Sequence, residues 1–325
     1  MIVVTGGAGF IGFNLVKRLI KLGYNDIVVI DNNYPKKSFN KFFHNVKYLN
    51  VEDSYIWLPF NKYEIEVIFH LGARTDTMEM NEKFFKRLNL NYSKFIWNLC
   101  SEVDIPLIYA SSAATYGDGQ DGFNDEDSIN NLKPLNPYGW SKHNFDLHVL
   151  DDTLTKSKPS FWYGLKFFNV YGNHEQHKGS MASVIWHLYL QIKQTGKVNL
   201  FKSNFYLYEN GEQRRDFIHV DDIVNILINI YENKINIPSN IYNLGTGTAR
   251  TYNDLAKEIF NVLGKEPSIS YIDIPMVIKD SYQSYTKAKM DKLLKFIPNY
   301  KFISLEKGIQ LYIKQLEDEN CKHYS

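Results

Sequence analysis

The chain has 325 residues, of which 44% are hydrophobic and 22% are charged, a balance typical of folded globular proteins. Domains usually contain about 100 to 200 residues, so this length suits one compact unit with two lobes. The formal net charge of +1 gives no overall attraction for a polyanion, and we therefore expect no nucleic-acid partner.

The composition also bears on metals and on membranes. The two cysteines, Cys100 and Cys321, cannot form a zinc site by themselves, and we expect no metal. The chain passes from four strand-like residues straight into glycines, whereas a signal sequence has a basic start and an apolar core. No apolar run reaches the roughly 18 residues that a membrane span requires. We therefore expect a cytoplasmic protein with no membrane partner.

Short, apolar, β-branched segments recur along the first half of the chain, with helical patterns between them. They lie at 2–5, 26–31, 66–73, 105–113 and 163–172. Such runs are typical of strands that are buried on both faces of a parallel sheet. A first helix follows residue 9, since Ile11, Leu15 and Leu19 recur at i, i+4 spacing and Gly23 suits its C-terminal end. The sequence thus predicts an α/β fold with a Rossmann-type, doubly wound parallel sheet.

After residue 172 the pattern loosens into helices and irregular stretches. Three helices are predicted, over 180–195, over 251–263 and from Ser304 onwards. The second of these opens on Thr251 with Asp254 three residues later, which is the pattern of a capping box. The third has an apolar face made of Leu305, Ile309, Tyr312 and Leu316.

Two later segments, 214–222 and 239–247, also read as strands, and we expect both to return to the main sheet. The predicted domains follow from this. Residues 1–172 with about 214–247 form an NAD(P)-binding Rossmann domain. A smaller, mixed α/β, substrate-binding lobe contains about 173–213 and 248–325.

Glycines at three-residue spacing separate the first strand from the first helix. Gly6, Gly9 and Gly12 allow a tight turn and a close approach of the backbone to a pyrophosphate, which the N-terminus of the helix then stabilises. A plain strand-to-helix turn is the structural alternative. The strand before, the helix after and an acid about 20 residues on together favour dinucleotide binding.

That acid is Asp31, at the end of the second strand, where it can accept hydrogen bonds from an adenosine ribose. Asp31 alone favours NAD. However, Asn32 follows it, and Lys36 and Lys37 are near enough in the sequence to neutralise a 2'-phosphate. The two lysines could equally lie in a solvated loop. The residues therefore leave NADP and NAD both open, and we expect NADP with NAD as the alternative.

Tyr138 and Lys142 stand four residues apart and therefore share one face of a helix. A phenol normally titrates near pH ~10, so tyrosine acts as an acid or base near neutrality only when a cation stabilises its phenolate. Lys142 can supply that charge. Upstream, Ser111 and Ser112 end a predicted strand, and their hydroxyls could bind a substrate oxygen.

Together these motifs resemble the extended short-chain dehydrogenase/reductase family over residues 2 to about 315. The resemblance rests on "TGGAGFIG", Asp31, "HLGA", Asn89, "YASSAATYG", "PYGWSK", "FFNVYG" and "RRDFIHVDD". Most members are nucleotide-sugar epimerases and dehydratases with a Rossmann lobe and a sugar-nucleotide lobe. The resemblance implies that Tyr138 is the acid/base, Lys142 its partner and Ser112 the serine that binds the reacting oxygen.

Within the family, dehydratases carry an Asp-Glu pair where this chain has Ala113 and Ala114, so we do not expect a dehydratase. The subgroup it resembles most is that of the ADP-L-glycero-D-manno-heptose 6-epimerases, through "SSAATYG", "PLNPYGWSK", "HKGSMASV" with His187, and "SYQSYT". These supply the heptose of the lipopolysaccharide inner core. The resemblance implies NADP-dependent epimerisation at C6, Lys178 as a second acid/base, and a homo-oligomer, a pentamer in that subgroup.

The resemblance also implies two sets of binding residues. Those expected to bind the cofactor are Gly6, Gly9, Phe10, Ile11, Gly12, Asp31, Asn32, Lys37, Leu71, Ala73, Asn89, Lys142, Val170 and Lys178. Those expected to bind the ADP-heptose substrate are Ser112, Asn169, Ser180, His187, Phe201, Lys202, Arg215 and Tyr282.

The chain departs from the subgroup in several places. Asn173 and His174 replace a proline and an arginine, Ser281 replaces a frequent arginine, and 205–213 is longer than expected. These changes bear on which nucleotide and sugar are bound. An alternative is therefore a 4-epimerase of a UDP- or GDP-hexose with tightly bound NAD, and a third is a catalytically silent nucleotide sensor. His174 and His177 are three residues apart, not four as in H-E-x-x-H, and read as loop residues.

Overall fold

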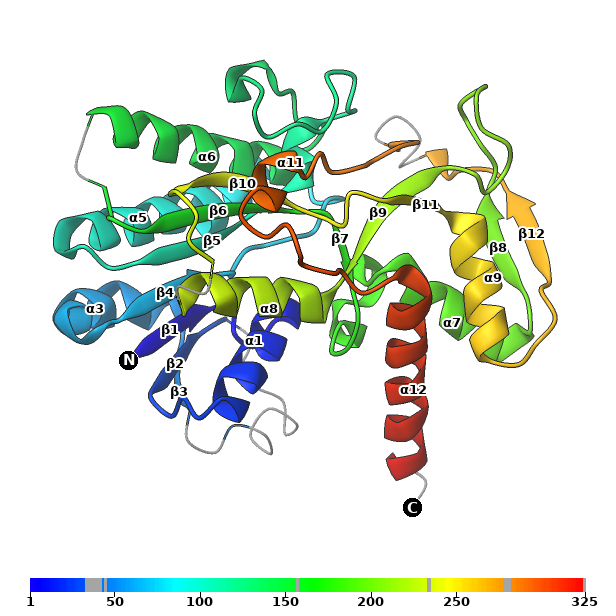
Figure 1. Cartoon of the computed structure of the whole chain (residues 1–325), viewed down its shortest axis with the longest axis horizontal. Coiled ribbons are helices and arrows are strands. Elements are labelled where there is room, and N and C mark those ends of the chain that lie inside the picture. Colours follow the sequence, from blue (N-terminus) through cyan, green and yellow to red (C-terminus); the bar gives the residue numbers. More distant parts are fainter. Residues whose placement is uncertain (33–42, 44–45, 156–157, 233–234, 277–281, 324–325) are drawn as a thin grey trace.

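The computed structural model describes residues 1–32, 43, 46–155, 158–232, 235–276 and 282–323. Its main feature is a seven-stranded sheet in the order β10-β6-β5-β4-β1-β2-β3, in which all neighbours are parallel (Figure 1). The strands are β1 (Ile2–Thr5), β2 (Ile27–Ile30), β3 (Lys47–Leu49), β4 (Val67–His70), β5 (Leu107–Ser112), β6 (Trp162–Phe167) and β10 (Asn240–Leu244). Since the chain winds away from β1 in both directions, the doubly wound prediction is confirmed.

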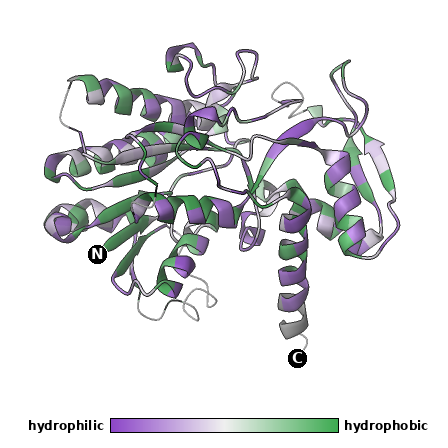
Figure 2. Cartoon of the chain, viewed as in Figure 1, coloured by the Kyte–Doolittle hydropathy of each residue, from purple (hydrophilic) through white to green (hydrophobic). Residues whose placement is uncertain are grey.

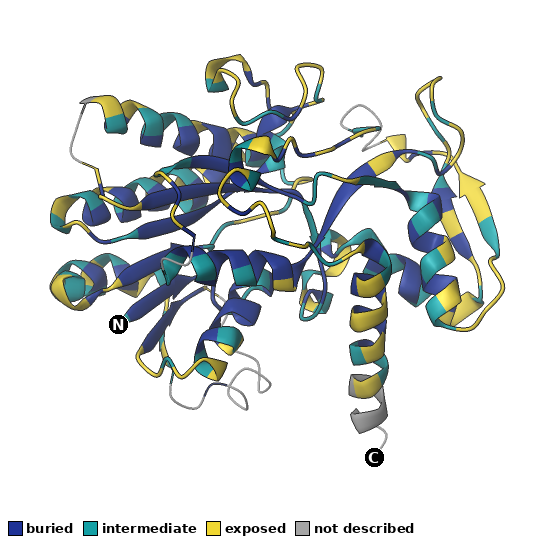
Figure 3. Cartoon of the chain, viewed as in Figure 1, coloured by how far each residue is buried: buried dark blue, intermediate teal, exposed yellow. Residues whose placement is uncertain are grey.

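Helices cover both faces of this sheet. Side chains alternate along a strand, so Ile2 and Val4 of β1 join one core, while Val3 joins the other. The helices of the main lobe are α1 (Phe10–Lys21), α3 (Val51–Asn61), α4 (Glu82–Phe85), α5 (Tyr92–Val103), α6 (Pro137–Thr155), α8 (Val220–Tyr231) and α11 (Asp291–Leu294). Figure 2 shows the inner strands as the most hydrophobic part of this lobe, and Figure 3 shows them buried, whereas β3 lies at the more exposed edge.

A smaller lobe has its own core. It contains two short sheets, formed by β7 (Asn169–Tyr171), β9 (Arg214–His219) and β11 (Ala249–Thr251), and by β8 (Val198–Phe201) and β12 (Ile269–Ile272). Its helices are α7 (Val184–Thr195), α9 (Tyr252–Val262) and α12 (Leu305–His323). The capping box of Thr251 and Asp254 is present at α9. The predicted apolar face of α12 is buried, from Leu305 to Leu316.

Three expectations about elements need correction. The segment 163–172 is not one strand: the chain leaves the main sheet at Phe168, and β7 pairs with β9 instead. The segment 214–222 does not return to the main sheet, because β9 pairs with β7 and β11. The helix predicted from residue 180 begins only at Val184, because Ala182 and Ser183 have extended backbone, with ψ 161 and 156, and Ser183 is the N-cap of the helix.

The segment 239–247 does return to the main sheet, since β10 pairs with β6. The limits of the two predicted domains remain a proposal. In the described part of the chain, no helix is long and apolar enough to cross a membrane.

Candidate active site

The glycine turn between β1 and α1 is packed on both sides by backbone. Gly6 has φ +69, and a Cβ on it would lie 2.6 Å from the Cα of Gly72, in the loop that follows β4. A Cβ on Gly12 would lie 2.1 Å from the carbonyl oxygen of Gly6. The first N–H groups of a helix have no partner within it, and the first turn of α1 carries no acidic residue. This end of α1 can therefore bind a pyrophosphate.

Asp31 follows β2 at the same edge of the sheet and is 9% exposed. The N–H of Ala8, in the glycine turn, donates to its Oδ2 at 3.0 Å. This contact holds the carboxylate beside the turn, where an adenosine ribose would lie if a dinucleotide bound there. Asn32 is exposed next to it, whereas Lys36 and Lys37 lie outside the described residues.

A buried chain of hydrogen bonds connects the glycine turn with the helix after β4. The N–H of Gly72 donates to Thr5 Oγ1 at 3.1 Å, and Thr5 Oγ1 lies 2.7 Å from His70 Nδ1. His70 Nε2 lies 2.8 Å from Ser93 Oγ, which donates to the carbonyl oxygen of Asn89. Since the Ser93 proton is used there, His70 must donate from Nε2 and accept at Nδ1. Burial lowers the pKa of His70 to about 3, so the ring is neutral.

Asn89 itself joins two parts of the site. Its Oδ1 accepts from the N–H of Arg74 at 2.8 Å, and its Nδ2 donates to the carbonyl of Arg74 at 3.0 Å and to Ser141 Oγ at 2.9 Å. Both hydrogens of the amide are thus used inside the protein. The side chain fixes the loop that carries Leu71 and Ala73 against α6.

Tyr138, Lys142 and Ser112 meet where α6 crosses the end of β5. Tyr138 and Lys142 lie one turn apart on α6, as their spacing predicts, and the Tyr138 phenol hydrogen-bonds the side chain of Ser112. The buried Lys142 Nζ donates to the carbonyl oxygen of Ala110, within β5, at 2.8 Å. The N–H of Ala114 donates to Ser112 Oγ at 3.1 Å and orients this hydroxyl.

Burial dominates the electrostatics of this cluster. It raises the pKa of Tyr138, and the negative charge of Asp146 raises it further, while the hydrogen bond from Ser112 lowers it. Burial also lowers the pKa of Lys142 to about 8, against an opposing effect of Asp146. Tyr138 is therefore protonated at neutral pH in this environment, and it can act as a base only when positive charge is added nearby.

Lys178 lies at the glycine-turn end of the site. It is half-buried in the short 3₁₀ turn Gln176–Met181, and its Nζ lies 5.5 Å from the centre of the Phe10 ring, at the start of α1. Burial lowers the pKa of Lys178, and the nearby Glu175 opposes this. The buried carboxylate of Glu175 in turn accepts from the N–H and hydroxyl of Ser183, the N-cap of α7, at 2.5 and 2.7 Å.

The smaller lobe presents an arginine among aromatic rings. The Arg215 guanidinium lies 5.3 Å from the centre of the Tyr282 ring and 5.8 Å from that of Tyr252. Phe201 packs edge-to-face on Tyr282, with 5.9 Å between ring centres. Gln283 donates to the carbonyl of Gly117, just after the serine strand, and its own carbonyl accepts from Arg215. The structure thereby brings three of the predicted substrate residues together and joins them to the other lobe.

The remaining predicted residues are more dispersed. Asn169 donates to the carbonyl of Asp216 at 3.0 Å, and Val170 packs at the edge of the main core. Lys202 is exposed and pairs with Asp273 at 3.0 Å. Ser180 is exposed and His187 is half-buried on α7. Within the described ranges, no hydrogen bond or ring contact joins Ser180 or His187 to the other site residues.

The departures at Asn173 and His174 pack against α1. The His174 ring lies 4.0 Å from that of Phe13, and the carbonyl of Asn173 accepts from Asn14 at 2.8 Å. His174 lies in a turn with φ +68, and His177 in the 3₁₀ turn. Among the described residues there is no group of three or more His, Cys, Asp or Glu side chains able to hold a metal. Ser281 lies outside the described residues.

Tyr252 and Gln283 are site residues that the sequence did not reveal. Tyr252 belongs to no motif, and within "SYQSYT" only Tyr282, not its neighbour Gln283, was expected to bind. Both reach Arg215 only through the packing of the smaller lobe. Asp146 was detectable, because it lies four residues after Lys142 on the same face of the helix.

Comparisons with known proteins agree with this geometry. The model of the NAD dependent epimerase/dehydratase family matches residues 2–245. The ADP-L-glycero-D-manno-heptose-6-epimerase of Nitratidesulfovibrio vulgaris (strain DP4) is 41% identical, with 97% of each chain covered. That of Fusobacterium nucleatum is 39% identical, with the same coverage. The solved structure of the Helicobacter pylori ADP-L-glycero-D-manno-heptose-6-epimerase has a TM-score of 0.79 at 26% identity, covering 97% of this chain and 96% of that one.

Proposed function

Because the chain belongs to the NAD dependent epimerase/dehydratase family, we propose that it epimerises C6 of ADP-D-glycero-D-manno-heptose to give ADP-L-glycero-D-manno-heptose. The membership confirms the resemblance to the extended short-chain dehydrogenase/reductases. The observation that carries the proposal is the meeting of Ser112, Tyr138 and Lys142 at the carboxyl edge of the sheet. The names of relatives about 40% identical support the choice of substrate.

The residues at the glycine turn fit a dinucleotide. No side chain could replace hydrogen on Gly6 or Gly12 without meeting backbone atoms, so both glycines are needed for the tight packing that positions the start of α1. That helix start, with no acidic residue in its first turn, can bind a pyrophosphate. A bound nicotinamide supplies the hydride acceptor for oxidation, the hydride donor for the return step and, when oxidised, a positive charge. We propose NADP as this cofactor, with Lys37 near the 2'-phosphate, and NAD as the alternative.

In the first half-reaction, Ser112 and Tyr138 bind the C6 oxygen of the substrate. Tyr138 takes the hydroxyl proton as the C6 hydrogen leaves as hydride, and a ketone remains. The buried Lys142, one helical turn away, stabilises the phenolate that this step requires, together with the positive charge beside it. When hydride returns, an acid must give a proton back to the same oxygen.

That second acid is Lys178 in our proposal. If a nicotinamide were held rigidly in the site, hydride would leave and return on one side of the substrate, so the ketone would have to present its other face, with the C6 oxygen in a different place. Burial lowers the pKa of Lys178 toward the range in which an ammonium can donate a proton. Tyr138 and Lys178 would thus serve opposite C6 epimers.

We assign the nucleotide half of the substrate to the smaller lobe. Arg215 can bind a diphosphate oxygen, while the rings of Phe201 and Tyr282 offer faces for a base. Lys202, exposed at the end of β8, adds a second positive charge. Asn169, Ser180 and His187 remain proposed contacts of the heptose.

The test is to incubate the purified protein with ADP-D-glycero-D-manno-heptose and, separately, with UDP-galactose, and to follow the epimer ratio by proton NMR. We expect interconversion of the two ADP-heptoses and none of the UDP-hexoses. Interconversion of the UDP-hexoses alone would refute the proposal in favour of a 4-epimerase. Cofactor released on denaturation identifies NADP or NAD by mass. We further propose a cytoplasmic homo-oligomer that supplies lipopolysaccharide heptose.

A further inference from the structure

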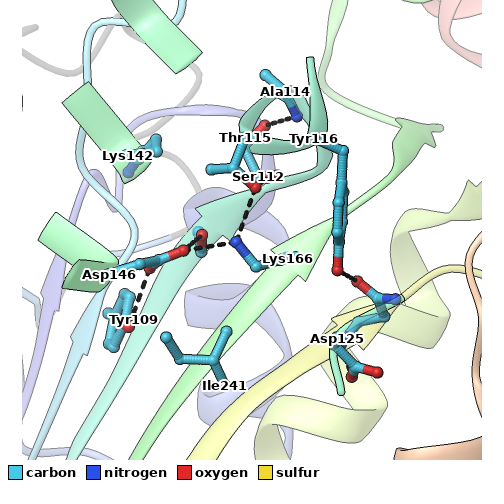
Figure 4. A network of polar contacts seen from close by, with 12 residues as sticks. Tyr109, Ser112, Ala114, Thr115, Tyr116, Asp125, Lys142, Asp146, Lys166 and Ile241 are labelled. Carbon is cyan, nitrogen blue, oxygen red and sulfur yellow. Dashed lines mark hydrogen bonds and ion pairs between the residues drawn. The ribbon is translucent and has the colours of Figure 1, made fainter. Parts of the chain in front are cut away.

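Beneath the catalytic cluster lies an ion pair that the proposed reaction does not use. Asp146 lies on α6, one turn beyond Lys142, and Lys166 lies on β6 (Figure 4). Lys166 Nζ is 2.7 Å from Asp146 Oδ2, and the two side chains are 3% and 0% exposed. Burying two charges costs free energy that can equal or exceed their mutual attraction, so stability alone does not explain why the pair is present. Its contacts point to a functional role.

Each member of the pair holds a neighbour of the catalytic serine. The Asp146 carboxylate accepts from Ser111 Oγ at 2.6 Å and from the Tyr109 hydroxyl at 3.0 Å, both on β5. Lys166 Nζ donates to Thr115 Oγ1 at 2.7 Å, and Thr115 Oγ1 donates to the carbonyl of Ser112 at 2.8 Å. The backbone at Ser112 is therefore held at two points. Asp146 binds the side chain of the preceding residue, Ser111, and Lys166 holds the carbonyl of Ser112 through Thr115.

We propose that Asp146 and Lys166 are positioning residues, which hold Ser112 in register with α6 and balance the charge that faces Tyr138 and Lys142. Because α6 carries Tyr138 and β5 carries Ser112, a pair that binds both elements fixes the distance between the two groups that would share the substrate oxygen. The expected effect on catalysis rests on the proposed function. The role of the pair in holding Ser112 and setting the local charge rests on the contacts alone.

The pair also shapes the local charge. The titratable groups around it are Lys142 and His143 on α6, Tyr109 on β5, and Tyr116 in the turn that follows. Asp125 and Lys292 line, with Lys166, a cavity of about 350 Å³ behind β6. The Asp146 charge raises the pKa of both Tyr138 and Lys142. Loss of Asp146 removes this negative charge, whereas loss of Lys166 leaves the Asp146 charge without its partner at 2.7 Å. The two changes should move the pKa of Tyr138 in opposite directions.

The experiment compares the full-length protein with Asp146→Asn, Lys166→Met and the double variant. Ionisation of Tyr138 is followed by tyrosinate absorbance, as the difference between each protein and the same protein with Tyr138→Phe. The pH dependence of kcat and KM is measured alongside. Asp152→Asn is the matched control, since Asp152 is a buried carboxylate on the same helix, bonded to the Trp97 indole at 3.1 Å and away from the site.

Asp146→Asn should lower the pKa of Tyr138, Lys166→Met should raise it, and the double variant should fall between them. The pH at which kcat rises should move in the same order, with kcat reduced about 10- to 100-fold in each single variant, as misplacement of a catalytic group by about 1 Å can cause. The control should change neither the pKa nor the pH profile. Shifts in one direction for both single variants, or no shift, would overturn the charge-balancing role.

Two further outcomes are decisive. If a single variant does not fold, kcat is measured for the double variant, which leaves no buried charge unpaired. A wild-type kcat in the double variant would overturn the positioning role. If the wild-type protein does not act on ADP-heptose, the proposed function fails, but the order of Tyr138 pKa values still decides this inference.

Discussion

Replacing Gly12 by alanine tests whether the packing of the glycine turn positions the cofactor. The new Cβ would lie 2.1 Å from the carbonyl oxygen of Gly6, 2.7 Å from its carbonyl carbon and 2.8 Å from the Cα of Gly7. All three atoms are backbone, so no side chain can rotate away. To restore ordinary van der Waals contact, α1 would have to retreat by about 1 Å or more.

The free energy follows from two opposing effects. Overpacking typically costs about 1 to 3 kcal/mol, and the rigid surroundings place this site at the upper end of that range. Alanine recovers about 1 kcal/mol through its higher helix propensity. We therefore expect a net loss of about 2 kcal/mol in the free energy of unfolding, a change of roughly 30-fold in the folding equilibrium. The N–H groups at the start of α1 also move away from the pyrophosphate.

Gly9→Ala is the matched control. Its Cβ would lie 3.2 Å from the carbonyl oxygen of Gly6, and Gly9 has φ −81, which alanine adopts without strain. Urea unfolding of the cofactor-free proteins and titration with NADP and NAD measure the two effects separately. Gly12→Ala should lose both stability and cofactor affinity. Gly9→Ala, which is a control for stability only because Gly9 is itself expected to bind the cofactor, should lose less than about 1 kcal/mol in the free energy of unfolding. If Gly12→Ala matched the wild type in both measurements, the packing argument would be wrong.

Three further predictions concern the chemistry and stability of the site. Lys178→Met should lower kcat for ADP-heptose epimerisation in both directions by about 100-fold or more, as loss of an acid/base does, and a wild-type rate would contradict the role of Lys178. Arg215→Lys should raise KM about tenfold with little change in kcat, because lysine does not stack between Tyr252 and Tyr282. The control is Arg214→Lys at the exposed neighbouring position, and equal effects of the two changes would count against a substrate-binding role of Arg215. His70 has a pKa of about 3 in the folded protein and about 6.5 when unfolded, so the unfolded state binds a proton in this interval and stability falls as the pH drops from about 6.5 to 3. His70→Gln should be less stable at pH 7 but lose less stability over that interval, and identical pH dependence in urea unfolding would exclude His70 as the cause.

Much of the fold was predictable because it depends on local patterns. Buried strands appear as apolar runs, and glycine spacing marks the turn that opens α1. The face shared by Tyr138 and Lys142 follows from helix geometry alone. The capping box of α9 and the start of α12 are likewise set by residues within one turn of the helix end.

The remainder depends on contacts between distant segments. The strand-like segment from Trp162 to Tyr171 contains no proline, and its one glycine, Gly164, lies inside β6, so no turn signal shows that the chain changes sheets at Phe168. The position of Tyr252 beneath Arg215 depends on how α9 packs on β9. The role of Asn89 as a link between a loop and α6 depends on partners at residues 74 and 141.

The change of sheet at Phe168 makes residue count a determinant of the active site. Lys166, in the main sheet, and Asn169, in the smaller lobe, are joined by two residues, and side chains alternate along extended backbone. An insertion or deletion of one residue there would turn Asn169 and Tyr171 to the opposite face of their sheet. The number of residues between Lys166 and Asn169 therefore sets which face of its sheet Asn169 occupies, whatever side chains stand at Phe167 and Phe168.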